Sequence, residues 1–228
     1  MVLLKRSGTG TRPIKPYRGM SMEGMIAKWY ARATKTDMAD FQQLATRIAS
    51  MLPLGSSVLE VAPGPGYLAI EMAKRGLAVE AVDVSETFVR IANDAARDVG
   101  VTVPFRQGDV HALPFKDASF SLIVCRAAFK NFSRPIDALR EIYRVLQPDG
   151  EALIIDMRHD ATDAEIEEFV AGRSSGRLGA LWNGWIFKTM LRRRAYLADD
   201  FQRMATEAAF RSCDIRLDSI GFEARLRR

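Results

Sequence analysis

Short apolar runs alternate with amphipathic stretches through the middle of the chain. The runs with the length and composition of buried strands are residues 58–61, 78–84, 103–105, 120–125 and 151–156. The stretches between them that place apolar side chains at helical spacing are residues 67–75, 86–99 and 136–146. This alternation predicts an open, doubly wound α/β sheet with parallel strands and helices on both faces.

Both ends of the chain depart from this alternation. Helices are predicted before the first strand at 25–30 and 37–52, and after the last parallel strand at 164–170, 181–191 and 199–208. Residues 172–180 are rich in Gly, Ser and Arg and are predicted to form a loose loop. Residues 213–217 and 221–226 are predicted to close the chain as a β-hairpin.

These patterns divide the chain of 228 residues into three parts. Residues 1–20, rich in Gly, Pro and basic residues, are predicted to be a mobile arm. Residues 21–52 form a helical cap, and residues 53–228 form the main domain. Residues 172–197 are predicted to act as a lid on that domain.

The net charge of +5 is unevenly distributed. Residues 1–35 carry eight Lys/Arg and one acid, residues 36–172 carry 13 against 21, and residues 173–228 carry 12 against six. An acidic body with two basic ends does not favour a general nucleic-acid-binding face.

Cysteine and histidine are scarce, with two of each. Cys125 and Cys213 stand alone, so we predict no metal site and a reducing, cytoplasmic location. No export signal is visible at the N-terminus. The longest weakly charged apolar stretch, Leu178–Leu191, is too short to span a bilayer.

The strongest chemical motif begins at the first predicted strand, where Val58-Leu59-Glu60-Val61 leads into Ala62-Pro63-Gly64-Pro65-Gly66 and then a helix. Glycines at such a turn let the backbone approach a ligand, and the helix N-terminus offers free N–H groups. Acids also follow the second and third strands, at Asp83 and Asp109. Because carboxyl ends of parallel strands share one edge, these acids are expected near the turn.

The glycine turn alone also fits a dinucleotide-binding fingerprint, with Asp83 at a suitable distance. Glu60 argues against NAD(P), because its charge would repel a pyrophosphate and suits a cationic amine. Asp83 suits the hydroxyls of a ribose, and Asp109 suits an exocyclic adenine amine. A ligand with an amine, a ribose and an adenine describes S-adenosylmethionine.

At these residues the chain resembles the class I S-adenosylmethionine-dependent methyltransferases, in particular the small-molecule branch related to ubiquinone and menaquinone biosynthesis enzymes. Besides the Glu60–Gly66 loop, the resemblance includes Ala81-Val82-Asp83-Val84-Ser85, Gly108-Asp109-Val110-His111-Ala112-Leu113-Pro114-Phe115 and Val145-Leu146-Gln147-Pro148-Asp149-Gly150. One departure is Ala62, where the family usually has Gly. The resemblance implies a Rossmann-like, mostly parallel seven-stranded sheet whose terminal hairpin is antiparallel.

The resemblance also implies a set of cofactor contacts. Glu60, Ala62, Gly64 and Gly66 would line the methionine end of S-adenosyl-L-methionine, and Asp83 would bind its ribose. Val84, Asp109 and Val110 would contact the adenine. Arg126, after the fourth strand, falls where the family's chain passes the cofactor. The product would be S-adenosyl-L-homocysteine.

Catalytic groups are less clearly marked. Methyl transfer is an in-line displacement in which positioning supplies much of the acceleration, and a base is needed only when the acceptor must lose a proton. His159 is the first candidate for a base because its ordinary pKa lies near neutrality. Lys130, after the fourth strand, and Tyr30, in the cap, are further candidates. His111 is read as a loop residue.

Residues 178–194 are the candidate acceptor side. They join an aromatic patch to the cationic run Arg192-Arg193-Arg194, which suits an apolar or anionic acceptor under a lid. A membrane-surface contact through 178–194 is a further reading that the shortness of the segment disfavours. Pro16-Tyr17-Arg18 of the arm could close over the cofactor from the other side.

The leading hypothesis is therefore a methyltransferase acting on a small molecule, with no nucleic-acid partner. An RNA or other nucleic-acid methyltransferase is the alternative that the basic ends favour. The residues after the fourth strand lack the Asn/Asp-Pro-Pro-aromatic motif of exocyclic base methylation. An NAD(P)-dependent oxidoreductase and a non-catalytic adenosylmethionine-binding protein also remain open. The acceptor atom and the oligomeric state are not written in the sequence.

Overall fold

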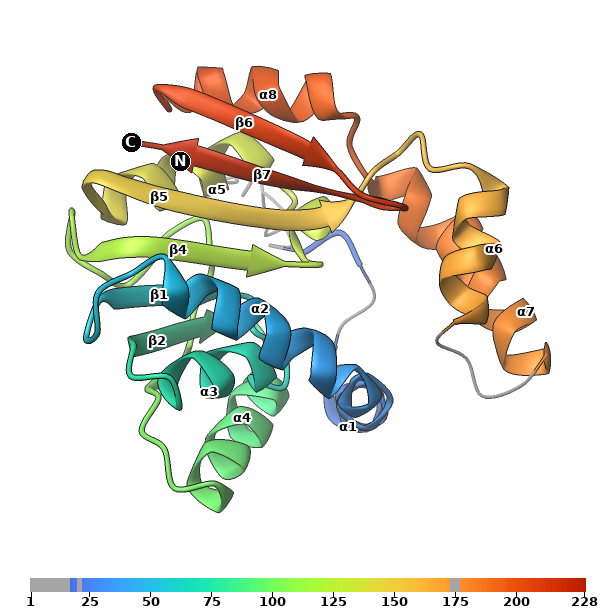
Figure 1. Ribbon diagram of the computed structural model, residues 1–228, viewed down its shortest axis with the longest axis horizontal. Helices are drawn as coiled ribbons and strands as arrows, with labels where there is room; N and C mark the ends of the chain where they lie inside the picture. The colour runs from blue at the N-terminus through green and yellow to red at the C-terminus, as the bar shows by residue number, and fades with distance from the viewer. Residues whose placement is uncertain (1–16, 20–21, 173–176) are drawn as a thin grey trace, which may run out of the picture.

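The computed structural model describes residues 17–19, 22–172 and 177–228, whose helices and strands are arranged as in Figure 1. Within these residues seven strands form one sheet in the order β3-β2-β1-β4-β5-β7-β6. The strands are β1 (Ser57–Val61), β2 (Ala78–Asp83), β3 (Phe105–Gln107), β4 (Phe120–Arg126), β5 (Leu146–Met157), β6 (Ser212–Leu217) and β7 (Gly221–Arg227). β1 to β5 are parallel, and β7 is antiparallel to both its neighbours. The predicted fold class is confirmed.

Helices cover both faces of this sheet (Figure 1). The helices are α1 (Gly24–Thr34), α2 (Met38–Ser50), α3 (Tyr67–Ala73), α4 (Glu86–Asp98), α5 (Pro135–Val145), α6 (Asp163–Ala171), α7 (Arg177–Ile186) and α8 (Ala198–Glu207). Shorter helical turns are η1 (Lys35–Asp37), η2 (Phe129–Asn131), η3 (Phe187–Leu191) and η4 (Arg192–Arg194). α2, α3 and α4 pack into one core, and α5 and α8 pack into the core on the opposite face.

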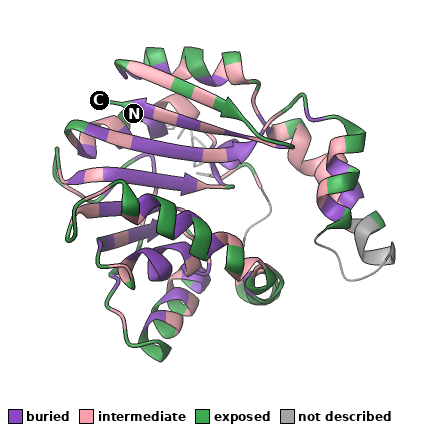
Figure 2. Cartoon of the chain, viewed as in Figure 1, coloured by how far each residue is buried: buried purple, intermediate pink, exposed green. Residues whose placement is uncertain are grey.

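The central strands feed both cores because successive side chains point to opposite faces. In β1, Val58 joins the core with α2 and α3, and Leu59 joins the core with α5 and α8. Figure 2 shows these strands as buried along most of their length. A parallel strand covered on both faces favours apolar residues throughout, so the acid Glu60 in β1 is an exception that needs a reason.

A third, smaller core lies beyond the sheet and holds α6 and η3 against the end of β5. It includes Met157, Ile166 and Ile220, with Phe169 and Phe187 packed against it. The prediction of a loose loop over 172–180 is wrong for 177–180, which form the first turn of α7. Composition suggested a loop, but α7 packs against α6, and tertiary packing overrides a weak local propensity. Residues 173–176 lie outside the described residues.

β5 is longer than predicted, because it begins at Leu146 instead of residue 151. Leu146 pairs with Phe120 and Glu151 pairs with Leu122, so the register shifts between the two pairs. The Gln-Pro-Asp-Gly motif is therefore an irregularity within the strand, with Asp149 at a φ of 61°.

The parallel strands all end at one edge of the sheet, which carries the candidate site. In Figure 1, α1 lies on one side of this edge and α6 and α7 lie on the other. The predicted division into arm, cap and lid stays a prediction. Residues 1–16 and 20 of the predicted arm and residue 21 of the predicted cap lie outside the described residues, whereas Tyr17–Gly19 are described.

Candidate functional site

A turn of small residues joins β1 to α3. Ala62, Gly64 and Gly66 all adopt positive φ angles, of 55°, 56° and 80°. Residues with a Cβ are disfavoured in this left-handed region by roughly 1–2 kcal/mol. The family's usual glycine at position 62 is explained by this conformation, and Ala62 keeps it at a modest cost in strain.

The two glycines of the turn meet different surroundings. A Cβ on Gly66 would lie 2.7 Å from Ala92 Cβ and 2.7 Å from ring atoms of Phe105, so the core requires glycine there. A Cβ on Gly64 would meet no atom of the described residues within 4 Å. Packing therefore does not require glycine at position 64, and the open space beside it is where a ligand could approach the backbone.

Glu60, near the end of β1, is 3% exposed. Its Oε2 atom has no hydrogen-bond partner among the described residues. Burial raises the pKa of this carboxyl to about 8, against the lowering effects of the Ala69 N–H group and the Arg126 charge. A buried carboxyl with an unpaired oxygen is costly unless a donor or a cation meets it.

Asp83 ends β2 and lies at the same turn. Its Oδ2 accepts from Gly64 N at 3.0 Å, and its Oδ1 accepts from Ser85 N at 2.8 Å. Burial raises the pKa of this carboxyl to about 6, opposed by these two backbone donors. Asp83 therefore fixes the glycine turn, and each of its oxygens retains a second lone pair for a ligand hydroxyl. The next residue, Val84, is 40% exposed and presents an apolar surface.

Asp109 follows β3 and is held by a histidine that the sequence analysis read as a loop residue. Its Oδ1 accepts from His111 N at 2.9 Å and lies 2.5 Å from His111 Nδ1. The His111 side chain is fully buried, and its Nε2 accepts from Arg134 N at 3.2 Å. His111 thus ties Asp109 to the start of α5. The contact between Asp109 and His111 is possible because the two residues are only two positions apart. Val110 between them is buried in the core with α5.

Arg126 ends β4 and links the site to the cap. Its guanidinium lies over the ring of Phe41 in α2, 4.5 Å from the ring centroid. Its charge lowers the pKa values of both Glu60 and Tyr30. Arg126 is therefore the cation that acts on the buried carboxyl in this structure.

Lys130 is buried in η2 and paired with Asp156 of β5. Its Nζ lies 2.7 Å from Asp156 Oδ1 and donates to Ala127 O at 2.6 Å. Asp156 also accepts from the backbone N–H groups of Lys130 and Met157. An ammonium held in this way favours a structural role for Lys130 over proton transfer. Asp156 was missed by the sequence analysis, because only the fold brings it beneath the loop after β4.

Two tyrosines lie over this edge of the sheet. Tyr30, on α1, packs edge-on against Phe88 with ring centroids 5.8 Å apart. Burial raises its pKa, Arg126 lowers it, and Asp83 and Asp156 raise it further. Burial, with a contribution from Tyr30, raises the pKa of Tyr17 to about 12. Asp83 and Asp156 influence this tyrosine as well, so both phenols share one environment with these acids and stay neutral near pH 7.

Arg18 fastens Tyr17 to the loop after β4. Arg18 N donates to Asn131 O at 2.7 Å, and its guanidinium donates to Ser133 O at 3.2 Å and to the Tyr196 hydroxyl at 3.3 Å. The described part of the arm, Tyr17–Gly19, is therefore anchored beside η2. The prediction that the arm covers a cofactor stays a prediction.

His159 lies in a different place from these groups. Its Nδ1 is 2.9 Å from the carbonyl oxygen of Arg192, so Nδ1 donates and Nε2 is the nitrogen able to take up a proton. It lines an open cavity of about 640 Å³ with Asp163, Lys188 and Arg192 among others. None of the predicted cofactor contacts lines this cavity within the described residues.

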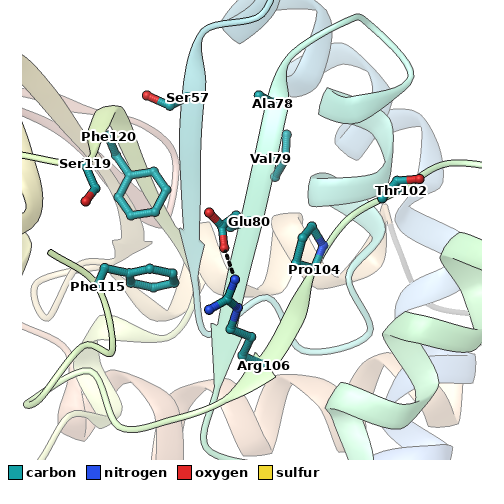
Figure 3. A pocket seen from close by; sticks show the side chains of 10 residues that line it. All are labelled: Ser57, Ala78, Val79, Glu80, Thr102, Pro104, Arg106, Phe115, Ser119 and Phe120. Atoms are coloured by element: carbon teal, nitrogen blue, oxygen red, sulfur yellow. Dashed lines mark ion pairs between the residues drawn. The ribbon is translucent and has the colours of Figure 1, made fainter.

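Figure 3 shows another pocket, of about 380 Å³, at the opposite end of the sheet. Its walls include Ser57, Ala78 and Phe120, the first residues of β1, β2 and β4. An ion pair of 2.8 Å between Glu80 and Arg106 crosses it. Ligands of open α/β sheets bind at the carboxyl ends of the strands, so this pocket is not the candidate site. Among the described residues, no group of three His, Cys, Asp or Glu could hold a metal ion.

The sheet order, the glycine turn after β1 and the acids Glu60, Asp83 and Asp109 define the class as a Rossmann-like methyltransferase fold. The family model described as a methyltransferase domain matches residues 59–154, which include the glycine turn and the three acids. Residues 59–154 of the chain therefore form a methyltransferase domain.

Known proteins similar to this chain support that assignment. An uncharacterized methyltransferase, YcgJ of Bacillus subtilis, is 37% identical over 114 residues, covering 50% of this chain and 45% of YcgJ. A demethylmenaquinone methyltransferase of Deinococcus radiodurans is 36% identical over 101 residues, covering 43% of this chain and 42% of that protein. The chain thus spans less than half the length of each of these two relatives.

A solved structure shares the fold over nearly the whole chain. It is a candidate S-adenosyl-L-methionine-dependent methyltransferase from Methanococcus maripaludis, with a TM-score of 0.73 and 24% sequence identity. The similarity covers 91% of this chain and 94% of that one. This similarity therefore extends beyond residues 59–154, which the family model matches.

Proposed function

We propose that this chain transfers the methyl group of S-adenosyl-L-methionine to a small apolar or anionic acceptor and releases S-adenosyl-L-homocysteine. The observation that carries the proposal is Glu60, a buried acid with an unpaired oxygen that directly precedes the turn through Gly64. A cationic amine would give that oxygen a hydrogen-bond donor and a positive charge, whereas a pyrophosphate would bring neither.

The residues present fit the parts of this cofactor. Glu60 would hold the amine, with Ala62, Gly64 and Gly66 shaping the backbone around the methionine end. Asp83 would accept from the ribose hydroxyls through its remaining lone pairs. Val84 and Val110 would border the adenine, whose amine Asp109 would bind in an orientation set by His111. Arg126 would balance the charge of Glu60.

The bound cofactor would supply a methyl group activated on a sulfonium, so the chain has mainly to orient the acceptor and exclude water. Tyr30 and Tyr17 are the side chains best placed for that task at the carboxyl edge. Because both phenols stay neutral, they would donate hydrogen bonds to acceptor oxygens instead of removing protons. Lys130 would hold η2 in place through Asp156. His159 would act as a base only for an acceptor that extends into its cavity.

The proposed acceptor side lies outside the residues that the family model matches. The matching family model ends at residue 154, before α6, α7 and η3. We propose that 21–52 cap the site and that 172–197 form its acceptor side, with 53–228 as the methyltransferase domain. The demethylmenaquinone methyltransferase relative makes quinols the first acceptor class to examine.

Product formation tests the activity. Purified protein would be incubated with methyl-labelled S-adenosylmethionine and separate pools of quinols, phenols and carboxylic acids, and S-adenosylhomocysteine would be measured. Formation of labelled product with one pool, reduced in Glu60→Gln, is the expected result. Binding of the cofactor without turnover on any pool would favour a non-catalytic binding protein.

A further inference from the structure

The helix α1 has two contrasting faces. Its small residues Ala27 and Ala31 are buried, 0% and 6% exposed, against the body of the protein. Its large apolar residues point outward, with Met25 85% and Trp29 61% exposed. Figure 2 shows this helix as mostly exposed. α1 therefore buries Ala27 and Ala31 and presents Met25 and Trp29 to the outside.

Two cations flank the outward apolar pair. Lys28 and Arg32 are exposed, and residues 25, 28, 29 and 32 fall on one side of a helix because they are three or four positions apart. α1 itself contains no acid. The carboxylate of Glu23, just before α1, accepts hydrogen bonds from the backbone N–H groups of Glu86 and Thr87. The outer face of α1, meaning Met25, Lys28, Trp29 and Arg32, is thus apolar at its centre and positive at its side.

We propose that the outer face of α1 docks on an anionic lipid surface. A tryptophan between cationic side chains suits the boundary of a bilayer, where the ring enters the headgroup region and the Lys and Arg heads reach lipid phosphates. Among the described residues, no helix is long and apolar enough to cross a membrane.

Charge complementarity selects this occupant over two others. A second copy docked through the same face would bring like charges together. Residues 1–16 carry Lys5, Arg6, Arg12 and Lys15 and no acid, so they too would be repelled. An anionic lipid surface is the partner with which both the apolar and the cationic residues of the outer face of α1 make favourable contacts.

The inner side of the same helix carries Tyr30, whose pKa responds to Asp83, Asp156 and Arg126. One helix therefore separates the docking face from the candidate site. Docking would place the entrance of that site at the lipid surface, where an apolar acceptor is dissolved. This last step rests on the proposed methyl transfer, whereas the docking itself does not.

Vesicle co-sedimentation of the full chain tests the docking. The probes are vesicles of phosphatidylcholine alone and of phosphatidylcholine mixed with phosphatidylglycerol. We expect binding to the anionic vesicles that weakens as salt is raised. The double variant Lys28→Glu/Arg32→Glu and the single variant Trp29→Ser should each lower the partition coefficient at least tenfold. Thermal melts and the calorimetric affinity for S-adenosylmethionine establish that the variants are folded.

Matched controls lie on other surfaces. Trp185→Ser changes an exposed tryptophan of α7, and Lys116→Glu reverses an exposed cation in the loop before β4. Each should change partitioning less than twofold. Absence of wild-type binding, or a loss caused by Trp185→Ser and not by Trp29→Ser, would overturn the proposal. So would sedimentation equilibrium showing self-association that Trp29→Ser abolishes. Failure of the wild type to bind S-adenosylmethionine would instead reject the proposed function and leave docking intact.

Discussion

The buried carboxyl of Glu60 should lose its proton when the amine of S-adenosylmethionine binds beside it. With a pKa of about 8, this carboxyl is roughly 90% protonated at pH 7. A cation at its unpaired oxygen favours the ionised form. Binding at pH 7 should therefore release close to one proton per site, about 0.9 by this arithmetic.

The same linkage sets the dependence of affinity on pH. Ionising the carboxyl of Glu60 in the free protein costs roughly 1.4 kcal/mol for each pH unit below its pKa. The dissociation constant for S-adenosylmethionine should therefore fall about tenfold from pH 6 to pH 7. The fall should lessen towards pH 8, where the free carboxyl begins to ionise by itself. Asp83, with a pKa of about 6, should steepen the dependence only below pH 6.

Calorimetry in two buffers of different ionisation enthalpy measures this proton release directly. Glu60→Gln should bind more weakly and release almost no proton, because the amide cannot ionise. Glu80→Gln is the matched control, since the Glu80 side chain lines the other pocket and pairs with Arg106. Tight binding by the wild type with no proton release at pH 7 would refute the assigned protonation state and the pairing of Glu60 with the amine.

Further predictions concern stability, the glycine turn and the acceptor side. Burial raises the pKa of Glu60 from 4.5 to about 8, so ionisation of this carboxyl should destabilise the fold as pH rises between these values. Glu60→Gln should therefore melt at a higher temperature than wild type at pH 8 and at the same temperature at pH 4. Equal melting temperatures at pH 8 would contradict this. Gly66→Ala should destabilise the fold by about 3 kcal/mol in urea unfolding, through its positive φ and its contacts with the core. Gly64→Ala should cost only about 1 kcal/mol yet weaken cofactor binding at least tenfold; unchanged affinity would remove Gly64 from the site. Tyr30→Phe should lower turnover about tenfold, the effect of one lost hydrogen bond, with cofactor affinity within twofold of wild type. His159→Ala should lower turnover with unchanged cofactor affinity if His159 is the base, and unchanged turnover would exclude it from that role.

The fold was predictable because its main features are local. A buried parallel strand must be apolar, and a strand that enters a helix through a tight turn needs small residues, so β1 and the turn to Gly66 are both visible in the sequence. The terminal hairpin could be predicted for the same reason. The extension of β5 to Leu146 could not, because it depends on pairing with Phe120 across the irregularity at Asp149.

The positions of the candidate site residues were predictable, but their states were not. The sequence placed Glu60 at the end of a strand, whereas its unpaired oxygen and raised pKa arise from packing by distant elements. The structural role of His111 follows from its hydrogen bond with Arg134 N, and that of Lys130 from its ion pair with Asp156. Neither contact is visible in the sequence. On the acceptor side, the sequence grouped His159 with the site, and the structure places it in a separate cavity.

The central claim is that the glycine turn beside Glu60 holds S-adenosylmethionine. A thermal-shift comparison of S-adenosylmethionine, S-adenosylhomocysteine, NAD and NADP on the purified chain tests it most directly. A ligand at one hundred times its dissociation constant adds about 2.7 kcal/mol to the free energy of unfolding, which raises the melting temperature measurably. We predict a shift with the first two ligands alone. A shift with only NAD or NADP would contradict the claim and show that the turn holds a pyrophosphate.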